Sequence, residues 1–244
     1  MQENKKVYCR SDIGTHRKNN EDIAYFSVSP YGEMLFIADG MGGHRKGEVA
    51  SKIACDTFSY LFLSNRKQFT LKSARKTLLK ALNKANKEIN NLSKTSPYKE
   101  LGTTVVSCII FSLGAYIISV GDSRLYTVKD DKLTQITVDQ TNIEFYKEIG
   151  KMDVFENPSS VRKLLISALG INPDIEDYEE MFIKKDDFDK IFLCSDGINS
   201  VLKDDEIKEI LLKDMDTEKK VEEVISSSLK KNVMDNVAVV LWEK

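Results

Sequence analysis

The chain has 244 residues, 41% hydrophobic and 30% charged, a composition typical of a globular protein with one large domain or two small ones. Its formal net charge of −2 argues against a nucleic-acid binder that works through a basic surface. The first residues, MQENKKVYCRSD, contain no apolar stretch of the kind found in secretory signals, so we expect a cytoplasmic protein.

The first part of the chain has short strands followed by long helices. Apolar runs predict strands over Val7–Arg10, Ala24–Val28 and Met34–Ala38. Beyond them, apolar residues recur at helical spacing from Glu48 to Leu63 and again from Ser73 to Leu92. We interpret both apolar stripes as helix faces that pack against the core.

The middle of the chain predicts two hairpins. The stretch from Leu101 to Gly121 has no charged residue and is long enough to suggest a membrane span. Its β-branched and small polar residues, with a turn at Ser112-Leu113-Gly114, favour two buried strands instead. A second hairpin is expected from Arg124–Val128 and Leu133–Ile136, joined by the tetrad KDDK.

The segment from Asp139 to Leu169 breaks the apolar pattern. It is polar and carries only weak helical signals, over Ile143–Ile149 and Ser160–Leu165. Long irregular insertions often act as lids or binding elements, and a plain surface excursion is the alternative. Both interpretations stay open.

The last part of the chain returns to strands and paired helices. Strand character is found at Ile191–Cys194 and Val237–Trp242, with helices expected after the acidic run at Asp204 and over Thr217–Leu229. This order disfavours a doubly wound parallel sheet and favours an α+β fold of antiparallel sheets covered by pairs of helices. Because there is no linker or repeat, we interpret residues 1–244 as a single domain.

Cysteine and histidine usage argues against a zinc site. The four cysteines form no C-x-x-C pair, and two histidines are too few to complete a typical zinc set. We expect reduced thiols, most of them buried in apolar stretches.

Four apolar runs end at, or begin just after, an aspartate, namely Asp39, Asp122, Asp196 and Asp235. Carboxylates gathered at the ends of buried strands repel one another and raise each other's pKa unless a multivalent cation neutralises them. Each aspartate alone is an ordinary turn residue, but their joint occurrence predicts a hard-metal site. Oxygen ligands, with a main-chain carbonyl such as that of Gly40, suit Mg²⁺ or Mn²⁺ and metal-activated water.

Two side chains near these acids have open roles. Arg17 precedes Glu21 and Asp22 by four and five residues, so it is either part of a surface ion pair or a planar fork that binds a phosphate. His44, in the glycine-rich run after Asp39, is either a structural residue or an acid or base.

The ordered motifs RKNNED, DGMGGH followed by GE, GTT, VGDSR, SALG, CSDG and DN resemble those of the metal-dependent protein phosphatase family, also called protein phosphatase 2C. The resemblance is to the compact single-domain bacterial type and spans essentially the whole chain. It implies a central antiparallel β-sandwich flanked on both faces by pairs of α-helices, in four layers α-β-β-α. It also implies a binuclear Mn²⁺ or Mg²⁺ centre at one end and makes residues 139–169 the family's flap.

The same resemblance implies metal ligands. Asp39 would bridge the two metals, the Gly40 carbonyl would bind one of them, and Asp196 and Asp235 would complete the other. Asp122 matches the residue that helps to bind a third, weaker metal in bacterial members.

Further roles follow from the resemblance. Asp22, together with Glu21, would hold metal-bound waters, and Arg17 matches the arginine that holds the substrate phosphate. Met41 stands where eukaryotic members have a histidine proposed as the general acid, so His44 is the nearby substitute.

The implied activity is hydrolysis of phosphoserine and phosphothreonine by a metal-activated water, without a phospho-enzyme. The implied partners are phosphorylated proteins, substrates of a cognate serine/threonine kinase, with no nucleic acid and no membrane. We expect a cytoplasmic monomer. Two alternatives stay open, a non-catalytic module of the same fold and a module dedicated to a single regulator.

Overall fold

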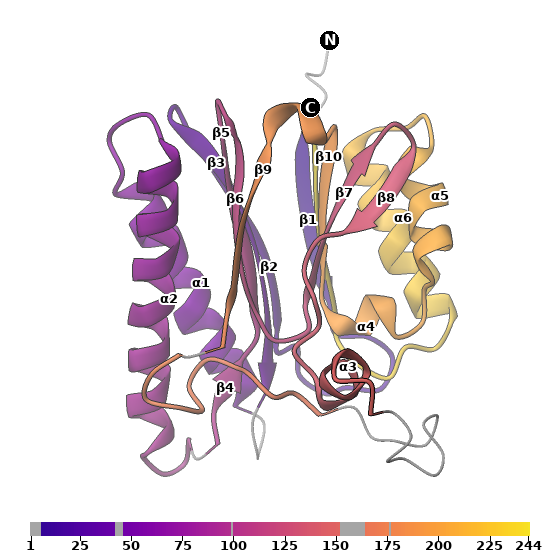
Figure 1. Cartoon of the computed structure of the whole chain (residues 1–244). Coiled ribbons are helices and arrows are strands. Elements are labelled where there is room, and N and C mark those ends of the chain that lie inside the picture. The colour runs from indigo at the N-terminus through magenta and orange to yellow at the C-terminus, as the bar shows by residue number, and fades with distance from the viewer. Residues whose placement is uncertain (1–5, 42–45, 99, 152–163, 176) are drawn as a thin grey trace.

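The computed structural model describes residues 6–41, 46–98, 100–151, 164–175 and 177–244. Its centre is a sandwich of two antiparallel sheets (Figure 1). Sheet A has the order β1-β11-β10-β7-β8, with β1 (Val7–Asp12), β11 (Val237–Glu243), β10 (Lys190–Cys194), β7 (Arg124–Lys129) and β8 (Lys132–Gln135).

Sheet B has the order β2-β3-β5-β6-β9, and a two-residue strand, β4, pairs with the end of β3. Its strands are β2 (Asp22–Ser29), β3 (Gly32–Met41), β4 (Gly102–Thr103), β5 (Val105–Phe111), β6 (Gly114–Val120) and β9 (Glu179–Lys184). A short 3-10 helix at Lys185–Asp187 leads from β9 toward sheet A.

Each sheet is covered on its outer face by a pair of helices. The helices α1 (Gly47–Leu63) and α2 (Leu71–Ser93) lie on sheet B, and α5 (Asp204–Leu212) and α6 (Thr217–Lys230) lie on sheet A (Figure 1). The predicted α+β fold with four layers α-β-β-α is therefore confirmed.

Three apolar layers fill the spaces between these four layers. Alternate residues of β3 face opposite ways, so Leu35 and Ile37 pack between the sheets while Phe36 packs under α1 and α2. Phe192 of β10 packs in the same manner under α5 and α6. Strands buried on both faces have few polar residues, which is why the sequence shows nearly continuous apolar runs there.

The uncharged stretch is a hairpin. All residues of β5 and β6 are buried, and Phe111 pairs with Gly114 across the turn. This arrangement confirms the predicted pair of buried strands. Among the described residues, no helix combines the length and the apolar character needed to cross a membrane.

The second predicted hairpin is also present as β7 and β8. Its two turn residues, Asp130 and Asp131, have φ of 47° and 58°, as a two-residue turn of type I′ requires. In contrast, the predictions missed β9, whose residues EEMFIK lie at the sheet edge and are only partly buried. They also missed α4 (Asp196–Asn199), which is too short to show a helical period.

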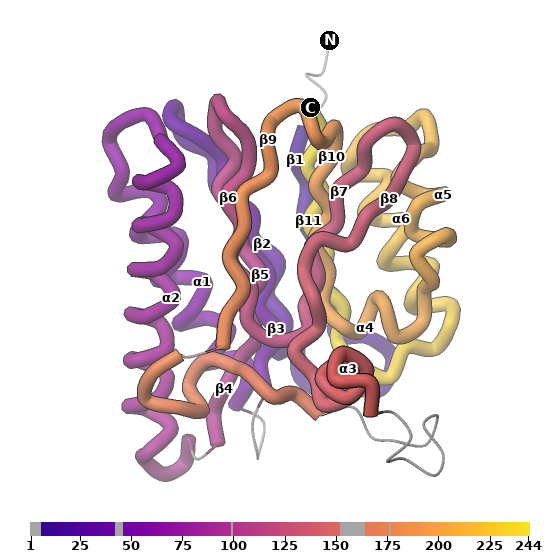
Figure 2. The backbone as a smooth tube through the Cα atoms, in the orientation of Figure 1, coloured from indigo at the N-terminus to yellow at the C-terminus, as the bar shows by residue number. Residues whose placement is uncertain are grey.

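The described parts of the segment predicted as a flap, residues 139–151 and 164–169, lie at one end of the sandwich (Figure 1). The weak helical signal over Ile143–Ile149 corresponds to α3 (Asn142–Glu148), which lies close to α4 in Figure 2. The helix predicted over Ser160–Leu165 falls mostly outside the described residues, and Leu165 forms a β-bridge with Thr141. The flap assignment and the single domain stay predictions.

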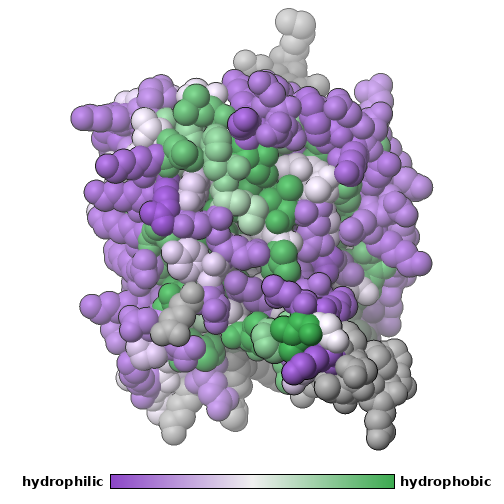
Figure 3. Space-filling view, in the orientation of Figure 1, coloured by the Kyte–Doolittle hydropathy of each residue, from purple (hydrophilic) through white to green (hydrophobic). Residues whose placement is uncertain are grey.

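The face of the molecule seen in Figures 1 and 3 has separate hydrophilic and hydrophobic regions. Figure 3 shows hydrophilic side chains over both helical layers and hydrophobic ones along the seam between the two sheets. Leu164 and Ile166, next to α3, are about half exposed, and so is Ile171, whose carbonyl oxygen accepts a hydrogen bond from Asn90 of α2. Charged and apolar surfaces therefore meet at the end of the sandwich where several strands run out.

Candidate active site

Two aspartates face each other at the end of sheet B. Asp22 and Asp39 occupy directly opposite positions in the antiparallel pairing of β2 and β3. Asp22 is only 4% exposed, and burial together with the charges of Asp196 and Asp235 raises its pKa to about 7. Burial and the charge of Asp22 likewise raise the pKa of Asp39 well above its ordinary value. Opposed carboxylates destabilise a sheet unless positive charge is supplied.

Sheet A brings two more aspartates to the same place. Asp196 begins α4 directly after β10, Asp235 precedes β11, and these strands are antiparallel neighbours. The absence of a side chain at Gly197 lets the segment after β10 contact the segment before β11, because a Cβ at this position would lie 2.0 Å from the carbonyl oxygen of Asn236. The CSDG and DN motifs thus pack backbone to backbone.

These carboxylates line one cleft. Asp122, in the turn between β6 and β7, is 3% exposed and faces the same cavity of about 530 Å³. Its polar lining also includes Arg17, Glu21 and Gly40. The remaining lining residues are Asp39, Met41, Leu164, Leu165, Ile171, Asp196 and Asp235.

The predicted site residues therefore differ in their placement. Arg17, Asp39, Gly40, Asp122, Asp196 and Asp235 come together in the cleft. Asp22 lies behind it, buried against Ser195. His44 lies outside the described residues.

The chemistry of these groups fits a hard cation. Within the described ranges, no three histidine, cysteine, aspartate or glutamate side chains form a self-sufficient metal site. An ion in the cleft would thus rely on carbonyl and water oxygens as well, which Mg²⁺ commonly does. Glu48 adds negative charge beside Glu21, and its Oε2 is buried without a hydrogen-bond partner in the part of the chain described. Such excess buried negative charge favours a bound cation.

The GTT motif holds Asp39 by its main chain. The Oγ1 of Thr103 donates to the Asp39 carbonyl oxygen at 3.0 Å, and the Asp39 N–H donates to Thr104 Oγ1 at 3.1 Å. Thr104 Oγ1 also contacts Ser123 Oγ at 2.8 Å, next to Asp122. The two threonines were part of a recognised motif, but the sequence carried no signal for this positioning role.

Two other supporting residues were missed. The Ser195 hydroxyl donates to Asp22 Oδ2 at 2.6 Å and accepts from the Ala238 N–H at 2.9 Å. The Asn236 amide accepts from the Glu21 N–H at 2.9 Å, and its nitrogen donates to the carbonyls of Ile13 and Asn19. These side chains join the ends of both sheets.

The glycines after Asp39 have a packing role. A Cβ on Gly40 would lie 2.2 Å from the carbonyl oxygen of Gly47, the first residue of α1. The Glu21 main-chain oxygen accepts from the Gly40 N–H, and Glu21 Oε1 accepts from the Gly47 N–H. The start of α1 can therefore lie against the end of β3 only when both positions lack a side chain.

Arg17 forms an ion pair, but not with its sequence neighbours. Its Nη2 lies 2.7 Å from Asp235 Oδ2, and the charges of Asp235, Glu21 and Asp39 raise its pKa against the effect of burial. The side chain remains 47% exposed inside the cleft. A guanidinium is thus held among the acids with part of its fork open to a ligand.

Comparisons with known proteins agree with this geometry. The sequence model of protein phosphatase 2C matches residues 14–239. Serine/threonine phosphatase stp of Listeria innocua is 30% identical over 240 residues, covering 96% of this chain and 94% of that protein. Protein phosphatase PhpP of Streptococcus pneumoniae is 26% identical, with 97% and 96% covered.

Solved structures give the same result. Serine/threonine phosphatase Stp1 from Staphylococcus aureus matches with a TM-score of 0.88 and 26% identity, covering 98% of this chain and 94% of that one. The catalytic domain of the phosphatase PstP in complex with two manganese ions matches with a TM-score of 0.80 and 28% identity, covering 97% and 96%. The chain belongs to the protein phosphatase 2C family.

Proposed function

We propose that this protein is a metal-dependent protein serine/threonine phosphatase that hydrolyses phosphoserine and phosphothreonine at a binuclear Mn²⁺ or Mg²⁺ site. The observation that carries the proposal is the single cleft in which four strand-end aspartates meet Arg17. Acids alone would repel a phosphate, and an arginine alone would not activate water. Acids that hold cations beside an arginine can bind a phosphate and also activate a water molecule.

The ligand assignment is the one that the family resemblance implies, and the shared cleft supports it. Asp39 and the Gly40 carbonyl would serve one metal, with Asp39 shared, and Asp196 and Asp235 would serve the other. Asp122, in the turn between β6 and β7, is assigned to a third metal ion that would bind more weakly. When bound, the cations would supply Lewis acidity and lower the pKa of a coordinated water.

The other residues hold these groups and the substrate. Asp22 and Glu21, behind and beside Asp39, would accept hydrogen bonds from coordinated waters. Arg17 would donate to the equatorial phosphate oxygens, since a planar fork matches that geometry. His44 is retained as the acid that protonates the leaving serine or threonine oxygen, from a segment outside the described residues.

The proposal also covers the substrates, the cellular compartment, the oligomeric state and the domain organisation of the protein. Relatives named serine/threonine phosphatase and protein phosphatase support phosphorylated proteins as substrates, and we extend this to the substrates of a cognate kinase. The four cysteines are unpaired thiols, which fits the reducing cytoplasm. We further propose that the enzyme acts as a monomer with residues 1–244 as one domain and 139–169 as its flap.

The test compares a phosphothreonine peptide with the matching phosphotyrosine peptide. We expect Mn²⁺-dependent release of phosphate from the first, loss of activity in EDTA, and recovery when Mn²⁺ is returned in excess. Comparable turnover of the two peptides would refute the serine/threonine assignment. Absence of turnover with either peptide would favour the non-catalytic module.

Replacing Arg17 with alanine distinguishes its two interpretations. If the guanidinium binds phosphate, kcat/KM for the phosphothreonine peptide should fall by about tenfold to a hundredfold, the worth of hydrogen bonds to a charged group. If it is only an ion pair with Asp235, activity should hardly change. The matched control is Arg75→Ala, which breaks the ion pair between Arg75 of α2 and Glu180 of β9, away from the cleft.

A further inference from the structure

The acidic cleft has apolar side chains in its lining as well as acids. Four large ones line it, namely Met41, Leu164, Leu165 and Ile171, and we call these four residues the apolar wall. Leu164 and Ile171 are each 50% exposed, and both open into the cavity that holds the aspartates. Exposed apolar side chains that gather inside a polar cleft are typical of a binding surface.

The apolar wall begins next to the candidate metal ligands. Met41 ends β3, two residues after Asp39. A Cβ on Gly102 would lie 3.1 Å from Met41 Cε and 3.2 Å from Ile171 Cδ1, so the ends of these two side chains lie side by side over the glycine. Because consecutive strand residues are about 3.3 Å apart, the wall starts within about 7 Å of the Asp39 main chain.

One end of the apolar wall is held by α2. Asn86 and Asn90 are buried asparagines of this helix. The Oδ1 of Asn86 accepts from the Gly170 N–H at 2.7 Å, and the Nδ2 of Asn90 donates to the Gly170 carbonyl oxygen at 2.9 Å. The same nitrogen lies 3.4 Å from the Ile171 carbonyl oxygen. The Ile171 side chain is therefore presented from a fixed backbone.

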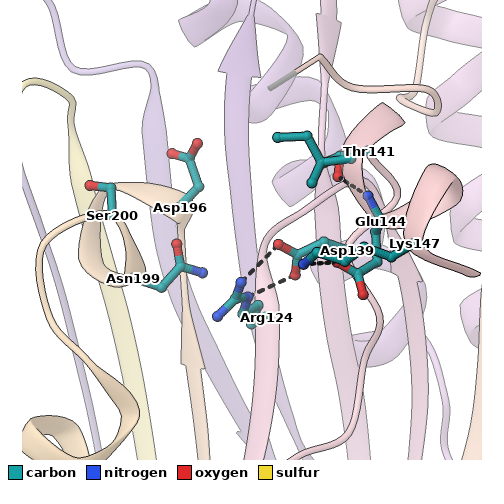
Figure 4. A pocket seen from close by; sticks show the side chains of 9 residues that line it. Arg124, Asp139, Thr141, Glu144, Lys147, Asp196, Asn199 and Ser200 are labelled. Atoms are coloured by element: carbon teal, nitrogen blue, oxygen red, sulfur yellow. Dashed lines mark hydrogen bonds and ion pairs between the residues drawn. The ribbon is translucent and has the colours of Figure 1, made fainter. Parts of the chain in front are cut away.

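The other end is held by the segment that follows β8. Arg124 donates from Nε and Nη2 to the two carboxylate oxygens of Asp139, at 2.7 Å and 2.9 Å (Figure 4). Three residues later, the Asn142 N–H donates to the Leu164 carbonyl oxygen at 2.9 Å, and Asn142 Oδ1 accepts from the Leu164 N–H at 2.8 Å. A wall that is formed before binding loses little conformational entropy when a ligand covers it.

The chemistry of the apolar wall selects an apolar occupant. Its side chains offer no N–H or O–H donor and no strong acceptor. A peptide group or a charged side chain placed against them would lose its water without gaining a hydrogen bond, which costs free energy. An aliphatic side chain has no such cost, and it would remove the exposed surface of Leu164 and Ile171 from water.

We propose that the apolar wall binds a large aliphatic side chain that lies one or two residues from the phosphorylated serine or threonine of the substrate. The inference rests on the proposed function, because a phosphate held by Arg17 and by the ions at Asp39 anchors the substrate in the same cleft. Residues of an extended substrate are about 3.3 Å apart, so the nearest neighbours of the phosphorylated residue reach the wall. The enzyme then prefers phosphorylated segments with leucine, isoleucine, valine or methionine at that position.

The experiment compares phosphothreonine peptides that differ at one position, with the Mn²⁺-loaded full chain. The reference peptide has alanine at the two positions before and the two positions after the phosphothreonine. Each test peptide carries leucine at one of these four positions, and its polar counterpart carries asparagine, which has a similar shape. For at least one position we expect leucine to raise kcat/KM about threefold to tenfold over the reference, as partial burial of one leucine predicts, and asparagine to give no rise.

Two variants and a control locate this preference. In Ile171→Ala, the ratio of kcat/KM between the preferred leucine peptide and the reference should fall toward one, because the leucine covers less apolar surface. Leu164→Ala gives the same test from the other end of the wall if thermal unfolding shows that the first variant does not fold. Leu113→Ala is the matched control and should keep the wild-type ratio. Leu113 is 58% exposed in the turn between β5 and β6, at the end of this hairpin away from Asp122.

Either of two results would overturn the inference. One is a wild-type ratio near one at all four positions. The other is a preference that both wall variants retain, even if they lower kcat/KM equally for every peptide and for p-nitrophenyl phosphate, since the wall would then support the metal site and not a neighbouring side chain. Failure of the proposed function looks different, because the wild type would then release no phosphate from any peptide.

Discussion

Asparagine in place of Asp39 is expected to lower kcat/KM for a phosphothreonine peptide by about a thousandfold or more. The substitution keeps the shape of the side chain but removes the charge that would be shared by two cations, and a barrier increase of about 4 kcal/mol gives this factor. Steady-state assays in saturating Mn²⁺ measure it. Asp56→Asn, at an exposed site on α1, should leave the activity unchanged.

The same variant should be more stable than the wild type when metal is removed. Asp39 is partly buried opposite Asp22, and its charged form is disfavoured by burial and by four neighbouring carboxylates. A neutral amide relieves that repulsion. An Asp39→Asn protein that unfolds earlier than the wild type in EDTA, or that retains activity in Mn²⁺, would contradict the site as proposed.

The metal-free protein is expected to lose stability as the pH rises from about 4 to 7. The folded state raises the pKa of Asp22 from 3.8 to about 7, so the protonated form is favoured by folding. The stabilisation that comes from protonated Asp22 is complete at pH values below 3.8, the pKa in the unfolded chain. It disappears as the pH rises past about 7, the pKa in the folded protein. The full range corresponds to about 4 kcal/mol in the free energy of unfolding.

The measurement is a difference between wild type and Asp22→Asn in EDTA. Subtraction is needed because other acids have the opposite slope, such as Glu180, whose pKa is lowered by hydrogen bonds from Arg75. The variant keeps an oxygen that can accept from Ser195. Adding Mn²⁺ should flatten the wild-type profile, and a difference that does not vary with pH would refute this account.

Much of the fold was accessible from local pattern. The apolar stripes of α1 and α2 and the apolar run of β3 depend on neighbours only a few residues apart, and their bounds agree with the structure within a few residues. The edge strand β9 was missed because its residues are only partly buried and carry no clear period. α4 was missed because four residues contain little more than one turn.

The site was accessible only in part. The aspartates at strand ends could be recognised one by one, and the ordered motifs indicated their family. Which carboxylates oppose one another depends on strand register, as for Asp22 and Asp39. The Arg17 partner, Asp235, is 218 residues away in the chain, and no local spacing predicts it.

The sequence by itself determined the composition of this site, its acids, its glycines and its arginine, because these residue types stand next to recognisable strands. The tertiary structure alone decided which of them meet. The hydrogen bond of Ser195 to Asp22 and that of Asn236 to Glu21 both join segments distant in sequence. Such contacts depend on how the two sheets and their helices pack together, and no short stretch of sequence specifies that packing.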